Sequence, residues 1–303
     1  MPNEKTIIIL SEKSSGSSAC QNLLAKSANI RHVSTTRHFE NETLYWVKAA
    51  SLLGRPQLKM VDSEVPIVRK QARADLIALL RDNVDPNYEP PMNDETLVME
   101  GWRLLCKHYS PIFLEKSPHH LCQWSALELI TEHIRTIKDV DFILIGLIRN
   151  PMDTIYSQYQ RWKSLPAEVE KQWLIAYQNL LKLKSILGDQ LVMVRYEDMI
   201  SSPQTLEPVF AFCDVIPSAA GGGYFHQQSL QKWRNDRLFG FTLSDEAVAL
   251  AAQYGYQRSE LANETHVLWP VAQTLARTAY VATKPVKTLV QHMLDKNKAM
   301  VGA

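Results

Sequence analysis

The chain has 303 residues and a formal net charge of +1, with 46% hydrophobic and 21% charged residues. This composition is ordinary for a globular protein, and the near-neutral charge argues against general binding to nucleic acids or membrane surfaces. The length allows one large α/β domain or two smaller ones, and we expect a single domain over residues 1–303.

The four cysteines, which are Cys20, Cys106, Cys122 and Cys213, lie far apart and form no CxxC pair. This spacing favours reduced, buried thiols over a disulfide framework or a zinc site, and with no other metal-ligand cluster in the sequence we expect no metal. The chain has no apolar run long enough to cross a membrane, and its first residues do not resemble a signal peptide. We therefore expect a cytoplasmic protein without a membrane partner.

Four short apolar segments rich in β-branched residues predict buried parallel strands. They are Thr6–Leu10, Pro111–Leu114, Asp141–Ile148 and Gln190–Arg195. Helical patterns separate them over Leu121–Ile137, Ala167–Leu187 and Pro203–Cys213, with Ser202 as the expected N-cap of the last. This alternation predicts an α/β fold, a parallel β-sheet flanked by helices, with ligands at the carboxyl ends of the strands.

A helical insertion of about residues 40–108 follows the first βα unit, with helical patterns over Thr43–Leu53 and Pro66–Arg81. We expect it either to shape a substrate pocket or to form a passive helical layer. Further along, Ser218–Gly223 is typical of a flexible joint. The helical tail, about residues 259–303, is expected to pack on the domain or to pair with a second subunit as a homodimer.

The most informative segment lies at the end of the first predicted strand, where a loop of small and hydroxyl residues leads into a helix. The loop residues are Lys13, Ser14, Ser15, Gly16, Ser17 and Ser18. A strand–loop–helix order directs backbone N–H groups and the positive end of a helix dipole at one point, which suits a phosphate. Gly16 is followed by Ser17 and not by the Lys-Ser/Thr of a nucleoside-triphosphatase loop, which disfavours ATP. Taken alone, such a turn can also be a plain connection.

A second phosphate-binding pattern follows the third predicted strand. Arg149 ends that strand, Pro151 lies in the first turn of the next helix, and Ser157 lies about two turns into it. A guanidinium and a hydroxyl placed in this way can bind one phosphate together, although an isolated arginine more often forms a salt bridge between strand and helix. The presence of both patterns in one chain favours a nucleotide site.

With these two motifs the chain resembles the sulfotransferases that use 3′-phosphoadenosine-5′-phosphosulfate (PAPS). The resemblance implies that the first loop binds the 5′-phosphosulfate and that Arg149 and Ser157 bind the 3′-phosphate. Three further blocks keep the family's order and extend the likeness to about residue 241: Phe113–Pro118, Val194–Asp198 and Ser229–Arg234. A comparable loop of the family closes over the nucleotide, which implies that Ser229 and Lys232 contact it.

The resemblance also implies catalytic residues. The family usually has Lys or Arg where this chain has Ser14, so Lys13, one position earlier, is expected to stabilise the leaving phosphate oxygen, unless another cation does so. Glu115 matches the catalytic base of glycan-modifying relatives and is the first candidate for the base, the alternative being an ion pair with Lys116. His119, with its neighbour His120, is the second candidate, although adjacent histidines at a helix start are more often capping or surface residues.

The implied reaction transfers a sulfuryl group from PAPS to a hydroxyl or amine of a small acceptor and leaves adenosine 3′,5′-bisphosphate (PAP), without a metal. We expect a secondary metabolite such as a saxitoxin-like alkaloid as the acceptor, and a carbohydrate O-sulfotransferase is the alternative. A nucleotide kinase is disfavoured because no lysine follows Gly16. A non-catalytic nucleotide-binding protein is supported only by the displaced Lys13.

Overall fold

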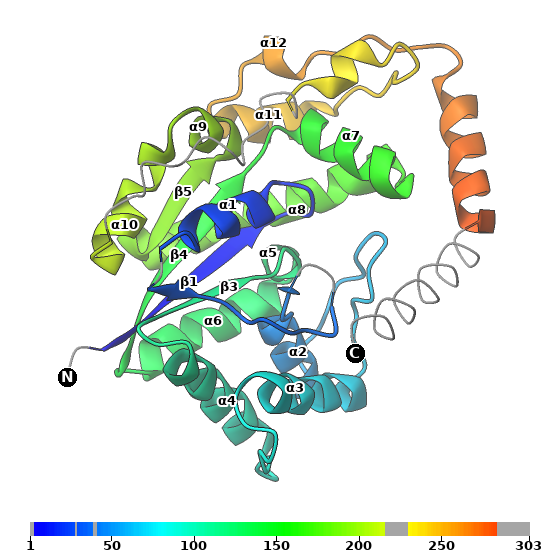
Figure 1. Cartoon of the computed structure of the whole chain (residues 1–303). Helices are drawn as coiled ribbons and strands as arrows, with labels where there is room; N and C mark the ends of the chain where they lie inside the picture. The colour runs from blue at the N-terminus through cyan, green and yellow to red at the C-terminus, as the bar shows by residue number, and fades with distance from the viewer. Residues whose placement is uncertain (1–2, 28, 39–40, 216–229, 284–303) are drawn as a thin grey trace, which may run out of the picture.

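The computed structural model describes residues 3–27, 29–38, 41–215 and 230–283. Its centre is a sheet of five parallel strands in the order β2-β3-β1-β4-β5 (Figure 1). The strands are β1 Glu4–Ser11, β2 Ile30–Arg31, β3 Ile112–Lys116, β4 Val140–Ile148 and β5 Leu191–Arg195. The four predicted strands are confirmed, and the α/β fold with them. β2 was missed because two residues are too few to show a periodic pattern.

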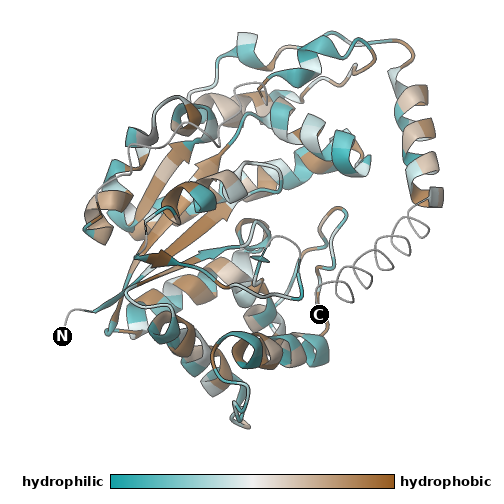
Figure 2. Ribbon diagram, in the orientation of Figure 1, coloured by the Kyte–Doolittle hydropathy of each residue, from teal (hydrophilic) through white to brown (hydrophobic). Residues whose placement is uncertain are grey.

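The two faces of the sheet are covered by different helices because successive side chains of a strand point to opposite sides. Ile7 and Ile9 of β1 pack with residues of α1 (Ser17–Leu24), α9 (Tyr196–Ser201) and α10 (Glu207–Cys213). Ile8 and Leu10 face the larger core, which includes α6 (Trp124–Thr136) and α8 (Pro166–Leu187). Hydropathy colouring shows the strands as apolar segments between helices with polar outer faces (Figure 2).

The insertion forms three helices that pack on the larger core: α2 Tyr45–Leu52, α3 Arg69–Asn83 and α4 Asp94–His108. The predicted helices over Thr43–Leu53 and Pro66–Arg81 correspond to α2 and α3. Every residue of α2 is buried, and its Trp46 ring lies 4.7 Å from the ring of Trp102 in α4. The residues between α2 and α3 turn back toward the carboxyl ends of the strands, where they form part of the site described below (Figure 1).

The predicted helices differ from the structure in two details. The helix expected over Leu121–Ile137 is broken into α5 (His119–Cys122) and α6 because Gln123 is extended, with φ −111° and ψ 97°. The Gln123 amide instead exchanges two hydrogen bonds, of 2.8 and 2.9 Å, with the backbone of Leu58. Ser202 occupies the N-cap position of a 3₁₀ turn (η3, Pro203–Leu206) that precedes α10, but its hydroxyl makes no capping bond and donates to Gln204 Oε1 at 2.6 Å.

The C-terminal part contains α11 (Asp245–Gln253), α12 (Arg258–Leu261) and a helix that starts at residue 269. This last helix packs back on the domain through Arg277, whose guanidinium binds the Asp62 carboxylate at 2.8 and 3.1 Å. The expected joint at Ser218–Gly223 lies outside the described residues. Within the described ranges, no helix is long and apolar enough to cross a membrane.

The four cysteines are free and buried, as their spacing predicted. Burial raises the pKa of the Cys20 and Cys106 thiols to about 12, so both stay protonated at neutral pH.

Candidate active site

The loop between β1 and α1 has a backbone that suits an anion. Ser14 and Gly16 both have left-handed conformations, with φ of 63° and 89°. A Cβ atom added to Gly16 would lie 2.3 Å from two ring atoms of Tyr196, so this position requires glycine for its conformation and for space. The first turn of α1 has no acidic residue and no side-chain cap, which leaves its backbone N–H groups available to a ligand.

The buried carboxylate of Glu12, which sequence reasoning missed, anchors this loop through hydrogen bonds. Glu12 has no exposed surface and accepts hydrogen bonds from Cys122 Sγ at 2.8 Å, Gln158 Nε2 at 3.1 Å and Gln172 Nε2 at 2.5 Å. Gln158 also donates to the Lys13 carbonyl at 3.0 Å. Because these partners come from α5, α7 (Pro151–Trp162) and α8, the loop is fixed by three separate elements before any ligand binds.

Lys13 points from the loop toward the insertion. Its ammonium group donates to the Val61 carbonyl, lies 3.3 Å from the Asp62 carbonyl and stands 5.4 Å from the ring centre of Trp162. Lys13, Asp62 and Trp162 border a cavity of about 280 Å³ beside the loop, which we call the loop cavity. Its lining comes from the loop, from residues 38–64, from the start of α5 and from the end of α7: Lys13, Ser14, Gly16, Ser17, His38, Glu42, Asp62, Glu64, Pro118, His119, Arg161 and Trp162.

The two phosphate-binding patterns of the sequence meet in the structure. Arg149 follows β4 directly, and its Nη1 donates to the Ser14 carbonyl at 2.8 Å while the guanidinium lies 4.8 Å from the ring centre of Tyr196. Ser157 is half-buried on α7. The segment η6 (Lys232–Asn235) packs on this helix, where Trp233 is buried and the Gln231 N–H donates to Asp153 Oδ1 at 2.7 Å.

The contacts of the η6 segment place Lys232, which is exposed, on the element next to Ser157. Ser229 lies outside the described residues. Trp233 packs with Met152 and Phe239 and is not a stacking surface. Glu197, in the fourth motif block, accepts from the Asn150 N–H at 2.9 Å and the Tyr256 hydroxyl at 2.8 Å, which gives this block a structural hydrogen-bonding role.

Glu115, the first candidate for the base, is buried in a hydrogen-bond network. It is the fourth residue of β3 and only 1% exposed. Its Oε1 accepts from Thr43 Oγ1 at 2.7 Å and Ser117 Oγ at 2.5 Å, and its Oε2 lies 3.3 Å from Nε2 of the buried His120. Burial alone would raise its pKa, but His120 and the two hydroxyl donors outweigh burial and lower it.

Neither Glu115 nor His120 lines the loop cavity. Lys116 does not form the ion pair with Glu115 that was considered for it: its ammonium group contacts Glu42 at 3.2 Å and Ser18 at 3.3 Å. Residues 115 and 116 are neighbours on a strand and therefore face opposite sides. The role of Glu115 as a base stays a prediction, and it requires this network to open toward the acceptor.

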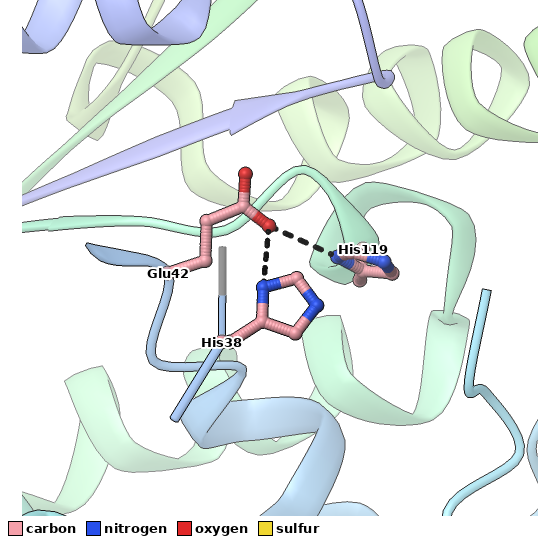
Figure 3. A group of neighbouring side chains, drawn as sticks. All are labelled: His38, Glu42 and His119. Atoms are coloured by element: carbon pink, nitrogen blue, oxygen red, sulfur yellow. Dashed lines mark ion pairs between the residues drawn. The ribbon is translucent and has the colours of Figure 1, made fainter. Parts of the chain in front are cut away.

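His119 does line the cavity, and it meets two residues that the sequence did not single out. Glu42 Oε2 lies 3.2 Å from His38 Nδ1 and 3.5 Å from His119 Nδ1, so that one carboxylate oxygen stands between two imidazoles (Figure 3). We call these three side chains the His–Glu–His cluster. His38 Nε2 also contacts Glu64 Oε1 at 2.6 Å. His38 and Glu42 lie at the start of the insertion, for which no motif was available.

The charges around this cluster shift its pKa values in opposite directions. Burial would lower the pKa of His38, but Glu42 and Glu64 outweigh burial and raise it to about 9. Burial lowers the pKa of His119 to about 3, so its imidazole is neutral at pH 7. The cluster therefore combines a charged and a neutral imidazole on one wall of the loop cavity.

The parallel sheet, with a glycine-containing loop between its central strand and α1, defines an α/β protein with a P-loop-like architecture. The model of the Sulfotransferase family matches residues 6–216, and the chain belongs to this family. The match ends before η6 and the C-terminal helices.

Two solved structures have the same fold. One is the "Sulfotransferase Domain from the Curacin Biosynthetic Pathway", with a TM-score of 0.55 and 18% identity over 85% of this chain and 99% of that one. The other is the "Sulfotransferase Domain from the Synechococcus PCC 7002 Olefin Synthase", with a TM-score of 0.55 and 17% identity over 85% of this chain and 97% of that one. Among curated proteins, none matches the chain.

Proposed function

We propose that the protein is a PAPS-dependent sulfotransferase that transfers a sulfuryl group to a hydroxyl or amine of a small polar acceptor. The observation that carries this proposal is the hydrogen bond from Arg149 to the Ser14 carbonyl, which joins the two phosphate-binding motifs in a member of the sulfotransferase family. PAPS carries phosphate groups at both ends of its ribose, and two adjoining anion sites match that distribution of charge.

The donor would be held mainly by preorganised groups. The N–H groups at the start of α1 would face the 5′-phosphosulfate, and Arg149 and Ser157 would bind the 3′-phosphate. Lys232, with Ser229, would contact the nucleotide. Lys13 would turn from the Val61 carbonyl to the bridging oxygen, where negative charge grows as the S–O bond breaks. The transition state of such a transfer is loose, so catalysis depends on in-line positioning and charge stabilisation.

A second cavity supports a polar acceptor. It has a volume of about 900 Å³ and shares Asp62 and Glu64 with the loop cavity. Charged side chains of both signs line it, among them Lys59, Lys171 and Arg277. Such a wall favours a compact, charged or hydroxylated molecule. A secondary metabolite such as a saxitoxin-like alkaloid fits this description, and a carbohydrate remains the alternative. The two structural neighbours named after biosynthetic enzymes favour natural product biosynthesis.

Of the two candidate bases, His119 is the one that lines the loop cavity, and its imidazole is neutral at pH 7. Burial makes it a weak base in this structure, so the nearby Glu42 carboxylate is needed for proton transfer. In the proposed step the acceptor oxygen bonds to sulfur, the bond between sulfur and the phosphate oxygen breaks, and the acceptor proton passes to His119. Glu42 would stabilise the imidazolium that forms. PAP leaves with the electron pair of the broken bond.

Isothermal titration calorimetry with PAP and with ATP tests the donor. We expect PAP to bind more tightly, and tighter binding of ATP would favour the kinase alternative and contradict the proposal. Mass spectrometry of acceptor mixtures incubated with PAPS then tests transfer by the mass gain of one sulfonate. Tight PAP binding without transfer to any acceptor would point to the non-catalytic alternative.

A further inference from the structure

We propose that the His–Glu–His cluster binds one divalent transition-metal ion of the Zn²⁺ type. The ligand atoms of His38, Glu42 and His119 all lie within 4.8 Å of one another and belong to side chains that are at most 22% exposed. The sequence did not predict such a site because the ligands come from two segments separated by α2, α3, α4 and β3.

The spacing of the ligand atoms fits a tetrahedral ion. Zn²⁺ binds nitrogen and oxygen ligands at about 2.0–2.2 Å, which separates neighbouring ligands of a tetrahedron by about 3.4 Å. Glu42 Oε2 lies 3.2 Å from His38 Nδ1 and 3.5 Å from His119 Nδ1 (Figure 3). Two of the three ligand pairs therefore already have the separation that a shared ion requires.

The buried ring nitrogen of His119 that faces this point lacks a hydrogen-bond partner. It is Nδ1, on a side chain that is 4% exposed. A buried nitrogen without a partner is costly, and a bound ion would satisfy it. A plain ion pair between His38 and Glu42 would leave the His119 nitrogen without a partner.

Outer contacts hold the ligands in this orientation. His38 Nε2 contacts Glu64 Oε1 at 2.6 Å, which keeps a proton on Nε2, and the charged imidazole would release its Nδ1 proton when the ion binds there. The second oxygen of Glu42 is 3.2 Å from Lys116 Nζ. Carboxylate–histidine–metal arrangements of this kind are common around zinc ions.

The ligand set also selects the class of metal. Imidazole nitrogen suits Zn²⁺ and its neighbours in the first transition row, whereas Mg²⁺ and Ca²⁺ prefer oxygen ligands alone. Two histidines and one carboxylate leave the fourth position of a tetrahedron for water or substrate, and here the cluster borders the loop cavity. Glu42 and Glu64 offset the positive charges of Lys13 and Lys116 nearby.

This inference rests on three side chains and not on the identity of the donor, so the proposed function and the metal site can fail separately. The bound ion would polarise an acceptor oxygen that occupies its open coordination position, and it would lower the pKa of the acceptor hydroxyl. His119 would then be a ligand, and its role as a base belongs to the metal-free protein.

The test is metal binding by chelator-treated full-length protein. We expect calorimetry with ZnCl₂ to show one equivalent bound, and Co²⁺ to produce the intense visible absorption of tetrahedral coordination. H38Q and H119Q should each weaken binding by more than 100-fold, and E64Q by about 10–100-fold as an outer contact. H108Q, which changes an exposed histidine elsewhere, is the matched control and should bind as the unchanged chain does.

Circular dichroism establishes that each variant is folded before it is titrated. If H119Q does not fold, E64Q still decides the question because its carboxylate is 44% exposed and lies at the edge of the cluster. Absence of one-to-one binding overturns the inference. Equal affinity of H38Q, H119Q and H108Q would show binding at surface histidines and would overturn it as well.

Discussion

Replacing Gly16 with alanine tests whether the loop is held by the aromatic ring behind it. The new Cβ would lie 2.3 Å from Cδ2 and Cε2 of Tyr196, so the ring must move. The left-handed backbone costs about 1–2 kcal/mol for a residue with a Cβ, and overpacking a buried ring costs about 1–3 kcal/mol. We therefore expect Gly16→Ala to lower the free energy of unfolding by about 2–5 kcal/mol.

Gly54 provides the matched control. It has φ 71° and nothing within 4 Å of an added Cβ, so Gly54→Ala carries the backbone cost of about 1–2 kcal/mol without the clash. Urea denaturation measures both variants. Because Tyr196 also supports the Arg149 guanidinium, Gly16→Ala should weaken PAP binding in calorimetry while Gly54→Ala leaves it unchanged. Equal destabilisation by the two substitutions would refute the packing argument.

Three further predictions concern the donor site, the base and pH. Arg149→Ala should weaken PAP binding by about 10- to 150-fold in calorimetry, the equivalent of about 1.5–3 kcal/mol for a charged hydrogen bond, and unchanged affinity would remove Arg149 from the donor site. His119→Gln should lower kcat by about 10²–10⁴-fold at unchanged PAP affinity, and a comparable fall in Glu115→Gln alone would return the base role to Glu115. Burial raises the pKa of Asp153 to about 6 despite the nearby Arg149, so the native state holds its proton more tightly than the unfolded state. Stability should therefore fall as the pH rises from about 4 to 6, by about 3 kcal/mol at most, and Asp153→Asn should flatten that part of a urea-denaturation pH profile.

The strands could be predicted because their signals are local, and the two loops predicted to bind the donor were found from signals of the same kind. A run such as Ile7–Leu10 is apolar on both faces, as a buried parallel strand must be, and Gly16 and Arg149 stand at fixed offsets from strand ends. The break at Gln123 depends on the Leu58 backbone and could not be read from the helical periodicity around it. Long-range partners decide such details.

The same reason explains what was missed in the site. Glu12 is adjacent to Lys13 in the sequence, yet its function follows from Cys122, Gln158 and Gln172, which the fold brings to it. His38 and Glu42 precede α2 in a region with no motif. The sequence did contain one local signal, because a histidine and a glutamate four residues apart can bind one ligand together. The pair His38 and Glu42 becomes a candidate metal site only when the fold brings His119 to it.

Asp62 connects a part of the chain that the family model matches with a C-terminal helix that lies outside the match. Its carboxylate accepts from Ser164 and Arg277, and its carbonyl receives Lys13, so the loop near the N-terminus and the helix starting at residue 269 meet at one residue. The match ends at residue 216, so a fragment cut there would keep the first four motif blocks and lose Arg277 from the lining of the cavity of about 900 Å³. If that cavity holds the acceptor, as we propose, variation in the C-terminal helix would change acceptor preference without altering the loop between β1 and α1.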